Sequence, residues 1–77
     1  MKYYINGDLI LTSDKEYAYA VVSKGKPGAI GGVCLHQLCR NSESARRALT
    51  NQVRRFSDRP EVAKTMRIVE LEKGAKE

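Results

Sequence analysis

Alternating apolar and polar residues fill much of the first half of the chain and predict β-strands. Two such runs, Lys2–Ile5 and Asp8–Thr12, flank the dipeptide Asn6-Gly7. This dipeptide favours a two-residue hairpin turn, because both turn positions need a positive φ. We expect a third strand over Tyr17–Ser23 and a fourth over Val33–Arg40. The chain should therefore open with a hairpin and continue with two more strands.

The third predicted strand has large residues on one face and small residues on the other. Because successive side chains of a strand point to opposite faces, Tyr17, Tyr19 and Val21 should share one face. The opposite face, with Ala18 and Ala20, would let a helix approach closely. We therefore expect a helix over the alanines and a tyrosine face left for solvent, a dimer partner or a ligand.

A helical period replaces the alternation after Asn41. At about 100° per residue, one side of a helix gathers Ala45, Ala48, Leu49, Val53 and Phe56. This pattern predicts one long amphipathic helix that is capped by Asn41 or Ser42 and ends near Phe56 or Ser57.

The remaining third of the chain carries a second helix-start signal and one more apolar run. Asp58-Arg59-Pro60-Glu61 predicts a short helical turn over Arg59–Lys64. Thr65–Leu71 predicts a final strand, and Glu72–Glu77 reads as a frayed polar tail.

These elements predict a single compact domain over residues 1–77 with the order β-β-β-β-α-β. The fold class is α+β, with an antiparallel sheet of four to five strands and one long helix on one face. A chain of 77 residues has room for one layer of sheet and one or two helices.

Charge changes this picture, because the net charge of +5 is concentrated in the helical region. Six of the seven arginines lie between Arg40 and Arg59. Residues 40–64 carry these six arginines and Lys64 against three carboxylates, a net +4. Such a basic field favours encounters with polyanions and also aids solubility.

Four of these arginines form what we call the arginine face: Arg46, Arg47, Arg54 and Arg55. On the predicted helix Arg47 and Arg54 project within about 20° of each other, opposite the apolar side, and Arg46 and Arg55 flank them. Guanidinium groups bind phosphate and carboxylate bidentately. The alternative is that this helix face has no functional role and is only solvated, with Glu43 paired to Arg46 and Arg47.

The glycine-rich loop from Lys24 to Gly32 resembles a phosphate cradle only superficially. A Walker loop needs Gly-Lys-Ser/Thr leading into a helix, and here a strand follows. We expect a flexible connection with Lys24 and Lys26 exposed at its tip. If the chain binds nucleic acid, these lysines join Arg40 and Arg59 as candidate phosphate contacts.

Cys34, His36 and Cys39 suggest a metal site, but their spacing argues against one. In a regular strand Cys34 and His36 share a face and Cys39 points to the other, and a structural zinc site needs four ligands where this chain has one histidine. No third group is placed to orient a Cys-His pair for nucleophilic catalysis. We expect two reduced cysteines, no metal, no cofactor and no enzymatic activity.

The sequence has no run of about twenty apolar residues and no secretory signal at its start, so we expect a cytoplasmic protein with no membrane partner. Tyr17 and Tyr19 are a possible second interface, for base stacking or for a protein partner such as a second copy of the chain.

Three segments carry a resemblance of the whole chain to known proteins: Met1–Gly7, Ser42–Phe56 and Arg67–Leu71. Taken whole, it resembles the very small accessory proteins of phages and mobile elements, including the anti-CRISPR class. That resemblance implies a non-catalytic inhibitor that acts by binding.

The leading hypothesis is a phage-encoded binding protein whose arginine face engages a nucleic-acid-processing complex, through acidic protein surface or nucleic acid. One alternative is a stand-alone nucleic-acid-binding domain that contacts phosphates with the same arginines. Another is a homodimeric structural protein.

Overall fold

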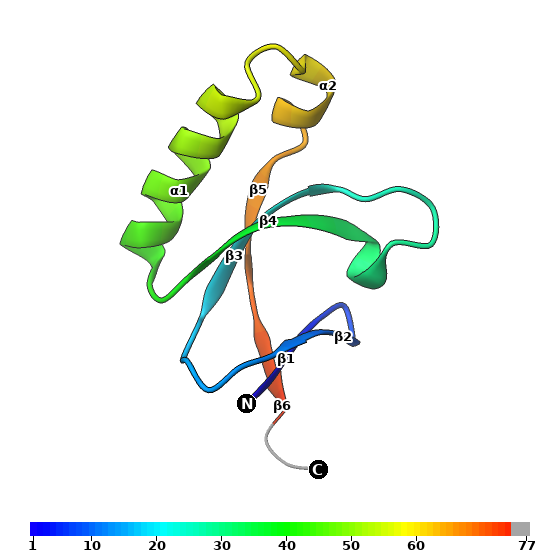
Figure 1. Cartoon of the computed structure of the whole chain (residues 1–77), viewed down its shortest axis with the longest axis vertical. Coiled ribbons are helices and arrows are strands. Elements are labelled where there is room, and N and C mark those ends of the chain that lie inside the picture. Colours follow the sequence, from blue (N-terminus) through cyan, green and yellow to red (C-terminus); the bar gives the residue numbers. More distant parts are fainter. Residues whose placement is uncertain (75–77) are drawn as a thin grey trace.

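The computed structural model describes residues 1–74 as two three-stranded antiparallel sheets and one long helix (Figure 1). The first sheet has the order β2-β1-β6 and contains β1 (Lys2–Ile5), β2 (Asp8–Thr12) and β6 (Glu72–Gly74). The second has the order β4-β3-β5 and contains β3 (Tyr19–Lys24), β4 (Val33–Cys39) and β5 (Arg67–Glu70). The α+β class is confirmed, but the strands form two sheets where one sheet of four to five strands was predicted.

The opening hairpin forms as its turn dipeptide predicts. Asn6 has φ 52° and Gly7 has φ 82°, and Ile5 pairs with Asp8 across the turn. Two consecutive residues with positive φ are what a type I′ turn requires, and its twist matches that of the flanking strands.

β6 corrects the prediction of a frayed tail from residue 72. Glu72, Lys73 and Gly74 pair with Tyr4, Tyr3 and Lys2 of β1, so the first three residues of that tail form a strand. The pairing uses backbone groups along the free edge of β1, which a polar sequence can satisfy as well as an apolar one. The rest of the predicted tail, 75–77, lies outside the described residues.

The main core lies between the two sheets. Tyr3 and Ile5 of β1 pack there against Ala20 and Val22 of β3, with Leu71 at the passage from β5 to β6. Tyr3 is fully buried. Its hydroxyl donates to the carbonyl oxygen of Lys15 at 2.8 Å and accepts the N–H of Tyr17 at 2.9 Å.

The long helix α1 (Ser42–Arg55) packs on the other face of the second sheet. Asn41 caps it, its side-chain oxygen accepting the N–H of Ser44 at 2.8 Å. Ala45 and Ala48 of α1 are buried against Val21 and Cys39, with Tyr19, Leu49 and Ile68 packed around them.

The predicted position of the helix over the alanine face of β3 was therefore wrong. α1 covers the face of Tyr19 and Val21, whereas Ala20 contributes to the core between the sheets. The small residues that allow close approach come from the helix, as Ala45 and Ala48. Ala20, in contrast, packs in the same core cluster as the bulky ring of Tyr3.

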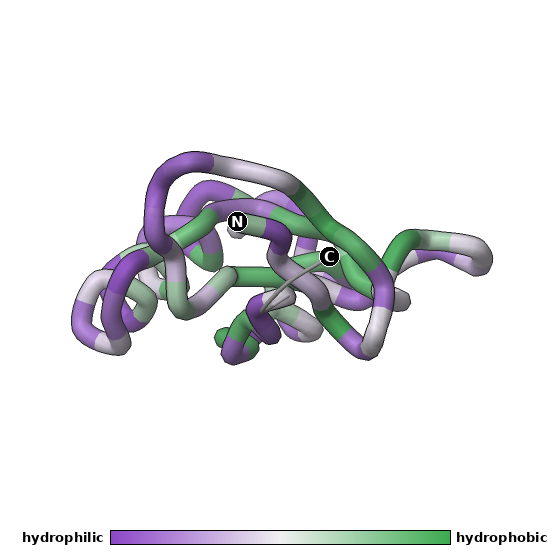
Figure 2. Tube along the Cα trace, turned by 90° about the horizontal axis from the view of Figure 1, so that it is seen from below, coloured by the Kyte–Doolittle hydropathy of each residue, from purple (hydrophilic) through white to green (hydrophobic). Residues whose placement is uncertain are grey.

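A short helix, α2 (Pro60–Ala63), follows α1 and confirms the predicted helical turn. Along the longest axis of the molecule, α1 and α2 lie at one end and the first sheet at the other (Figure 1). The Cα extents are 41 × 30 × 14 Å, and the view along the long axis in Figure 2 shows how thin the molecule is. Within residues 1–74, no helix is long and apolar enough to cross a bilayer.

Candidate functional site

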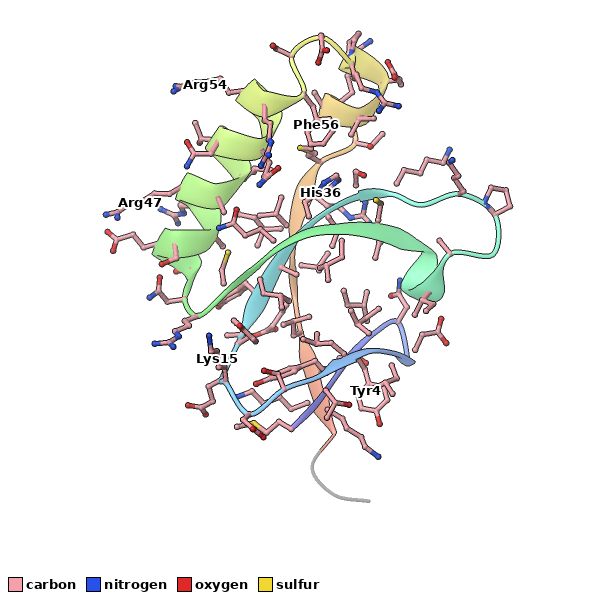
Figure 3. The ribbon with its side chains drawn as sticks, viewed as in Figure 1. Tyr4, Lys15, His36, Arg47, Arg54 and Phe56 are labelled. Carbon is pink, nitrogen blue, oxygen red and sulfur yellow. The ribbon has the colours of Figure 1, made fainter. Side chains whose placement is uncertain are left out.

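The arginine face forms on α1 as the helical period predicts. Arg46, Arg47, Arg54 and Arg55 are all exposed, and the side chains of Arg47 and Arg54 project from α1 away from both sheets (Figure 3). The opposite side of α1 is fixed to the second sheet through Ala45 and Ala48. The arginines therefore stand on a helix whose orientation is set by packing.

Acidic residues neutralise little of this face. Glu43 is the one carboxylate within α1, and it lies 3.9 Å from Arg47 with both side chains more than three-quarters exposed. A pair of that length and exposure contributes little to stability. Within residues 1–74, the side chains of Arg46, Arg54 and Arg55 form no ion pair or hydrogen bond. Of the two pairs in the alternative of a solvated face, Glu43 therefore makes the one with Arg47 and not the one with Arg46.

The other predicted contact residues lie in two separate places. Lys24, Lys26 and Arg59 line a groove of about 610 Å³, together with Cys34, His36 and Phe56; we call it the basic groove. Arg40 lines a smaller hollow of about 390 Å³ with Tyr17, where Glu16 and Lys73 also lie, paired at 3.7 Å. The eight cations predicted as partner contacts thus lie on a helix face, in a groove and in a hollow.

Hydrogen bonds hold both walls of the basic groove. The Lys24 N–H donates to Thr65 Oγ1 at 3.1 Å, tying the end of β3 to the segment after α2. The Gly25 N–H donates to the Gly32 carbonyl at 3.1 Å and closes the base of the loop. A Cβ at Gly25 would lie 2.8 Å from backbone atoms of Gly32 and Val33, so the loop ends approach too closely for any other residue.

The same loop is also attached to the first hairpin. The Gly31 N–H donates to Asp8 Oδ2 at 3.0 Å, and Asn6 Nδ2 donates to the Gly31 carbonyl at 2.8 Å. Residues 30–32 form a short 3₁₀ helix. The segment predicted as a flexible connection is therefore anchored to two other parts of the fold.

His36, which lines the basic groove, lies at an irregularity in β4. Val21 pairs with Gln37 but Val22 pairs with Leu35, so His36 is an extra residue in the ladder. Its Nε2 lies 2.9 Å from Ser23 Oγ, and its ring meets Phe56 edge to face with centroids 5.2 Å apart. Burial lowers the pKa of His36 below its ordinary value, because it disfavours the charged imidazole.

This irregularity overturns the expectation that Cys39 points away from Cys34 and His36. Cys39 is buried under α1, and His36 contacts Phe56 at the end of the same helix, so both lie on the helix side of the sheet. Both cysteines are free; Cys34 is exposed, and burial raises the pKa of the Cys39 thiol. Among the 74 described residues, no three His, Cys, Asp or Glu side chains gather as metal ligands would.

The predicted open tyrosine face does not form. Tyr19 packs beneath α1, and Tyr17 packs on Tyr3 with ring centroids 5.9 Å apart. Both are half-buried, and they belong to different packing clusters, on opposite sides of the second sheet.

No family model matches the chain, and no curated protein and no solved structure matches it either. The arginine face and the basic groove are therefore assigned as candidate sites from their geometry and charge alone.

The sequence indicated the first of these sites through helical periodicity. It did not indicate the second as a site, because the groove combines a β3–β4 loop with residues some thirty positions later in the chain.

Proposed function

We propose that this chain is a small non-catalytic binding protein that docks on a nucleic-acid-processing complex through its arginine face and blocks or modulates it. The observation that carries the proposal is the set of exposed guanidinium groups on α1, of which Arg46, Arg54 and Arg55 have no partner within residues 1–74. Guanidinium donors left free on a fixed helix match phosphate or carboxylate oxygens.

Preorganisation supports a binding role over a merely solvated face. α1 is capped by Asn41 and packed through Ala45 and Ala48, so a partner would not have to order the helix on binding. A face that only serves solubility commonly alternates its charges along the helix, whereas α1 sets four arginines against Glu43 alone. An inhibitory role is what the resemblance to anti-CRISPR-type accessory proteins implies.

A direct test is charge reversal at the centre of the face. Arg47→Glu combined with Arg54→Glu takes the net charge from +5 to +1, since each reversal removes two positive charges. Affinity capture from a bacterial lysate should recover a defined nucleic-acid-processing complex with the parent chain and lose it with this variant. The matched control, Lys15→Glu with Lys64→Glu, changes net charge equally at exposed sites off the face and should keep the complex.

Capture of the complex by both variants alike would remove the arginine face from the interaction. An empty capture with the parent chain would count against the proposal as a whole.

One alternative function also has an observation in its favour. Three further cations, Lys24, Lys26 and Arg59, line a groove, as a stand-alone nucleic-acid-binding domain would need. In that case labelled DNA or RNA should bind the purified chain with an affinity that falls steeply with salt. An unshifted probe at low salt would eliminate this alternative. A homodimer through Tyr17 and Tyr19 is not proposed, because both side chains are half-buried in packing contacts.

A further inference from the structure

The basic groove has a chemistry that the arginine face lacks, because it combines cations with an aromatic wall. From its lining and its charge we propose that the groove binds one unpaired nucleotide unit, with the base against Phe56 and Val62 and the phosphate at Lys24, Lys26 and Arg59. A groove of about 610 Å³ falls within the roughly 300–1,000 Å³ typical of small-ligand sites. This inference does not rest on the arginine face, since no residue of that face lines the groove.

The cationic part of the groove selects an anion. Lys24 ends β3, Lys26 lies in the loop that follows it and Arg59 precedes α2, so two segments distant in the sequence bring three positive charges to one place. No aspartate or glutamate of residues 1–74 lines the groove. Within residues 1–74, Arg59 pairs only with Glu61, at 3.6 Å through its Nε, and both side chains are more than half exposed. Its terminal nitrogens are therefore available to a phosphate.

The apolar part of the groove selects a flat group. Phe56, Val33, Val62 and Ala29 supply it, and the edge-to-face contact with His36 fixes the ring of Phe56 on one side. Aromatic side chains are the usual stacking platform for unpaired bases. Inorganic phosphate would leave this apolar surface uncovered, whereas a nucleotide would cover it and reach the cations together.

Two further lining residues, Ser23 and His36, give the bound unit a direction. Ser23 Oγ and His36 Nε2 lie 2.9 Å apart and satisfy each other. Burial disfavours the charged imidazole and lowers the pKa of His36, so this pair attracts phosphate less than the three cations do. The base therefore lies toward Phe56 and His36 and the phosphate toward Lys24, Lys26 and Arg59.

Cys34 makes the groove directly measurable, because its exposed thiol is part of the lining. A bound nucleotide should shield this thiol from an alkylating reagent. Cys39 is 4% exposed and serves as the internal control, since it should stay unreactive until the chain unfolds. Mass spectrometry of the labelled chain distinguishes the two sites.

The experiment compares adenosine monophosphate, adenosine and inorganic phosphate, each at millimolar concentration, as protectants of Cys34. We expect strong protection by the monophosphate and weak protection by the other two. Single-stranded oligoadenylate should protect and a duplex should not. Stronger protection by the oligonucleotide than by the free monophosphate identifies a strand as the source of the unit, and the reverse identifies a free nucleotide.

A pair of exposed-site variants separates binding from folding. Lys26→Ala combined with Arg59→Ala removes two of the cations, and protection should require about tenfold more monophosphate or greater. The control, Lys64→Ala with Arg67→Ala, removes two exposed cations that do not line the groove and should leave protection unchanged. The Arg47→Glu, Arg54→Glu variant should also retain protection of Cys34. The experiment therefore tests the groove independently of the function proposed for the arginine face.

Two results would overturn the inference. The first is unchanged alkylation of Cys34 with both the monophosphate and the oligonucleotide. The second is equal protection by inorganic phosphate and the monophosphate, which would reduce the groove to a simple anion site.

Discussion

Tyr3 and Tyr4 are adjacent in β1 and have very different surroundings. Tyr3 is fully buried between the sheets, and its hydroxyl satisfies both the Tyr17 N–H and the Lys15 carbonyl. Tyr4 is half-buried beside Gly74, and within residues 1–74 its hydroxyl has no hydrogen bond. One hydroxyl thus joins β1 to the segment before β3, whereas the other joins β1 to no other part of residues 1–74.

Replacing each tyrosine by phenylalanine should separate these roles. Tyr3→Phe keeps the ring but leaves a part-buried N–H and a part-buried carbonyl without their partner, and should lower the free energy of unfolding by about 1–3 kcal/mol. Tyr4→Phe removes a hydroxyl that has no hydrogen bond within residues 1–74 and should change the free energy of unfolding by less than about 0.5 kcal/mol. Urea denaturation measures both, and equal losses would show that the Tyr3 hydroxyl has no special structural role.

Among the elements, α1 carries the arginine face and depends on its cap. Asn41→Ala removes the side-chain oxygen that accepts the Ser44 N–H and should cost about 1 kcal/mol. Asn51→Ala is the matched control, because Asn51 is an exposed residue within the same helix and alanine is the better helix former there. The melting temperature should therefore fall for Asn41→Ala and stay unchanged or rise slightly for Asn51→Ala. A similar fall in both would argue against the cap.

The elements that the sequence predicted are those with local causes. Asn6-Gly7 specifies its turn through positive φ, and Asn41 specifies the start of α1 through its side chain. β6 has no such local cause, since Glu72–Gly74 becomes a strand only because β1 offers a free edge. The extra residue at His36 likewise depends on the pairing register of β4 with β3, and no residue type in that segment predicts it.

At the scale of the whole molecule, the passage from β5 to β6 joins the two sheets. The chain leaves the second sheet after Glu70, passes through buried Leu71 and enters the first sheet at Glu72. The pattern of apolar and polar residues in the strands does not indicate which strands pair, so it did not distinguish one sheet from two. The division into two sheets depends on the packing that buries Tyr3 and Leu71. The basic groove escaped prediction for the same reason, because only the tertiary fold brings Lys24 near Arg59.

Truncation tests the importance of β6. A chain ending at Leu71 leaves β1 and β2 as a two-stranded hairpin, which is marginal by itself. A chain ending at Gly74 keeps β6 and is the control. The first truncation should lower the melting temperature well beyond the second, since each lost kcal/mol corresponds to about 4–8 °C in a domain of this size. Equal melting temperatures would mean that β6 adds nothing to the first sheet.

The pairing of Lys2 with Gly74 has a practical consequence. The beginning of the chain and the end of β6 lie side by side in the first sheet, while α1 and α2 occupy the opposite end of the long axis (Figure 1). A short linker could therefore join Gly74 to Met1, and the chain could then be opened at another exposed position. For the same reason, attaching the protein to a bead or sensor surface at Met1 or at the end of β6 would turn the arginine face and the groove toward the sample.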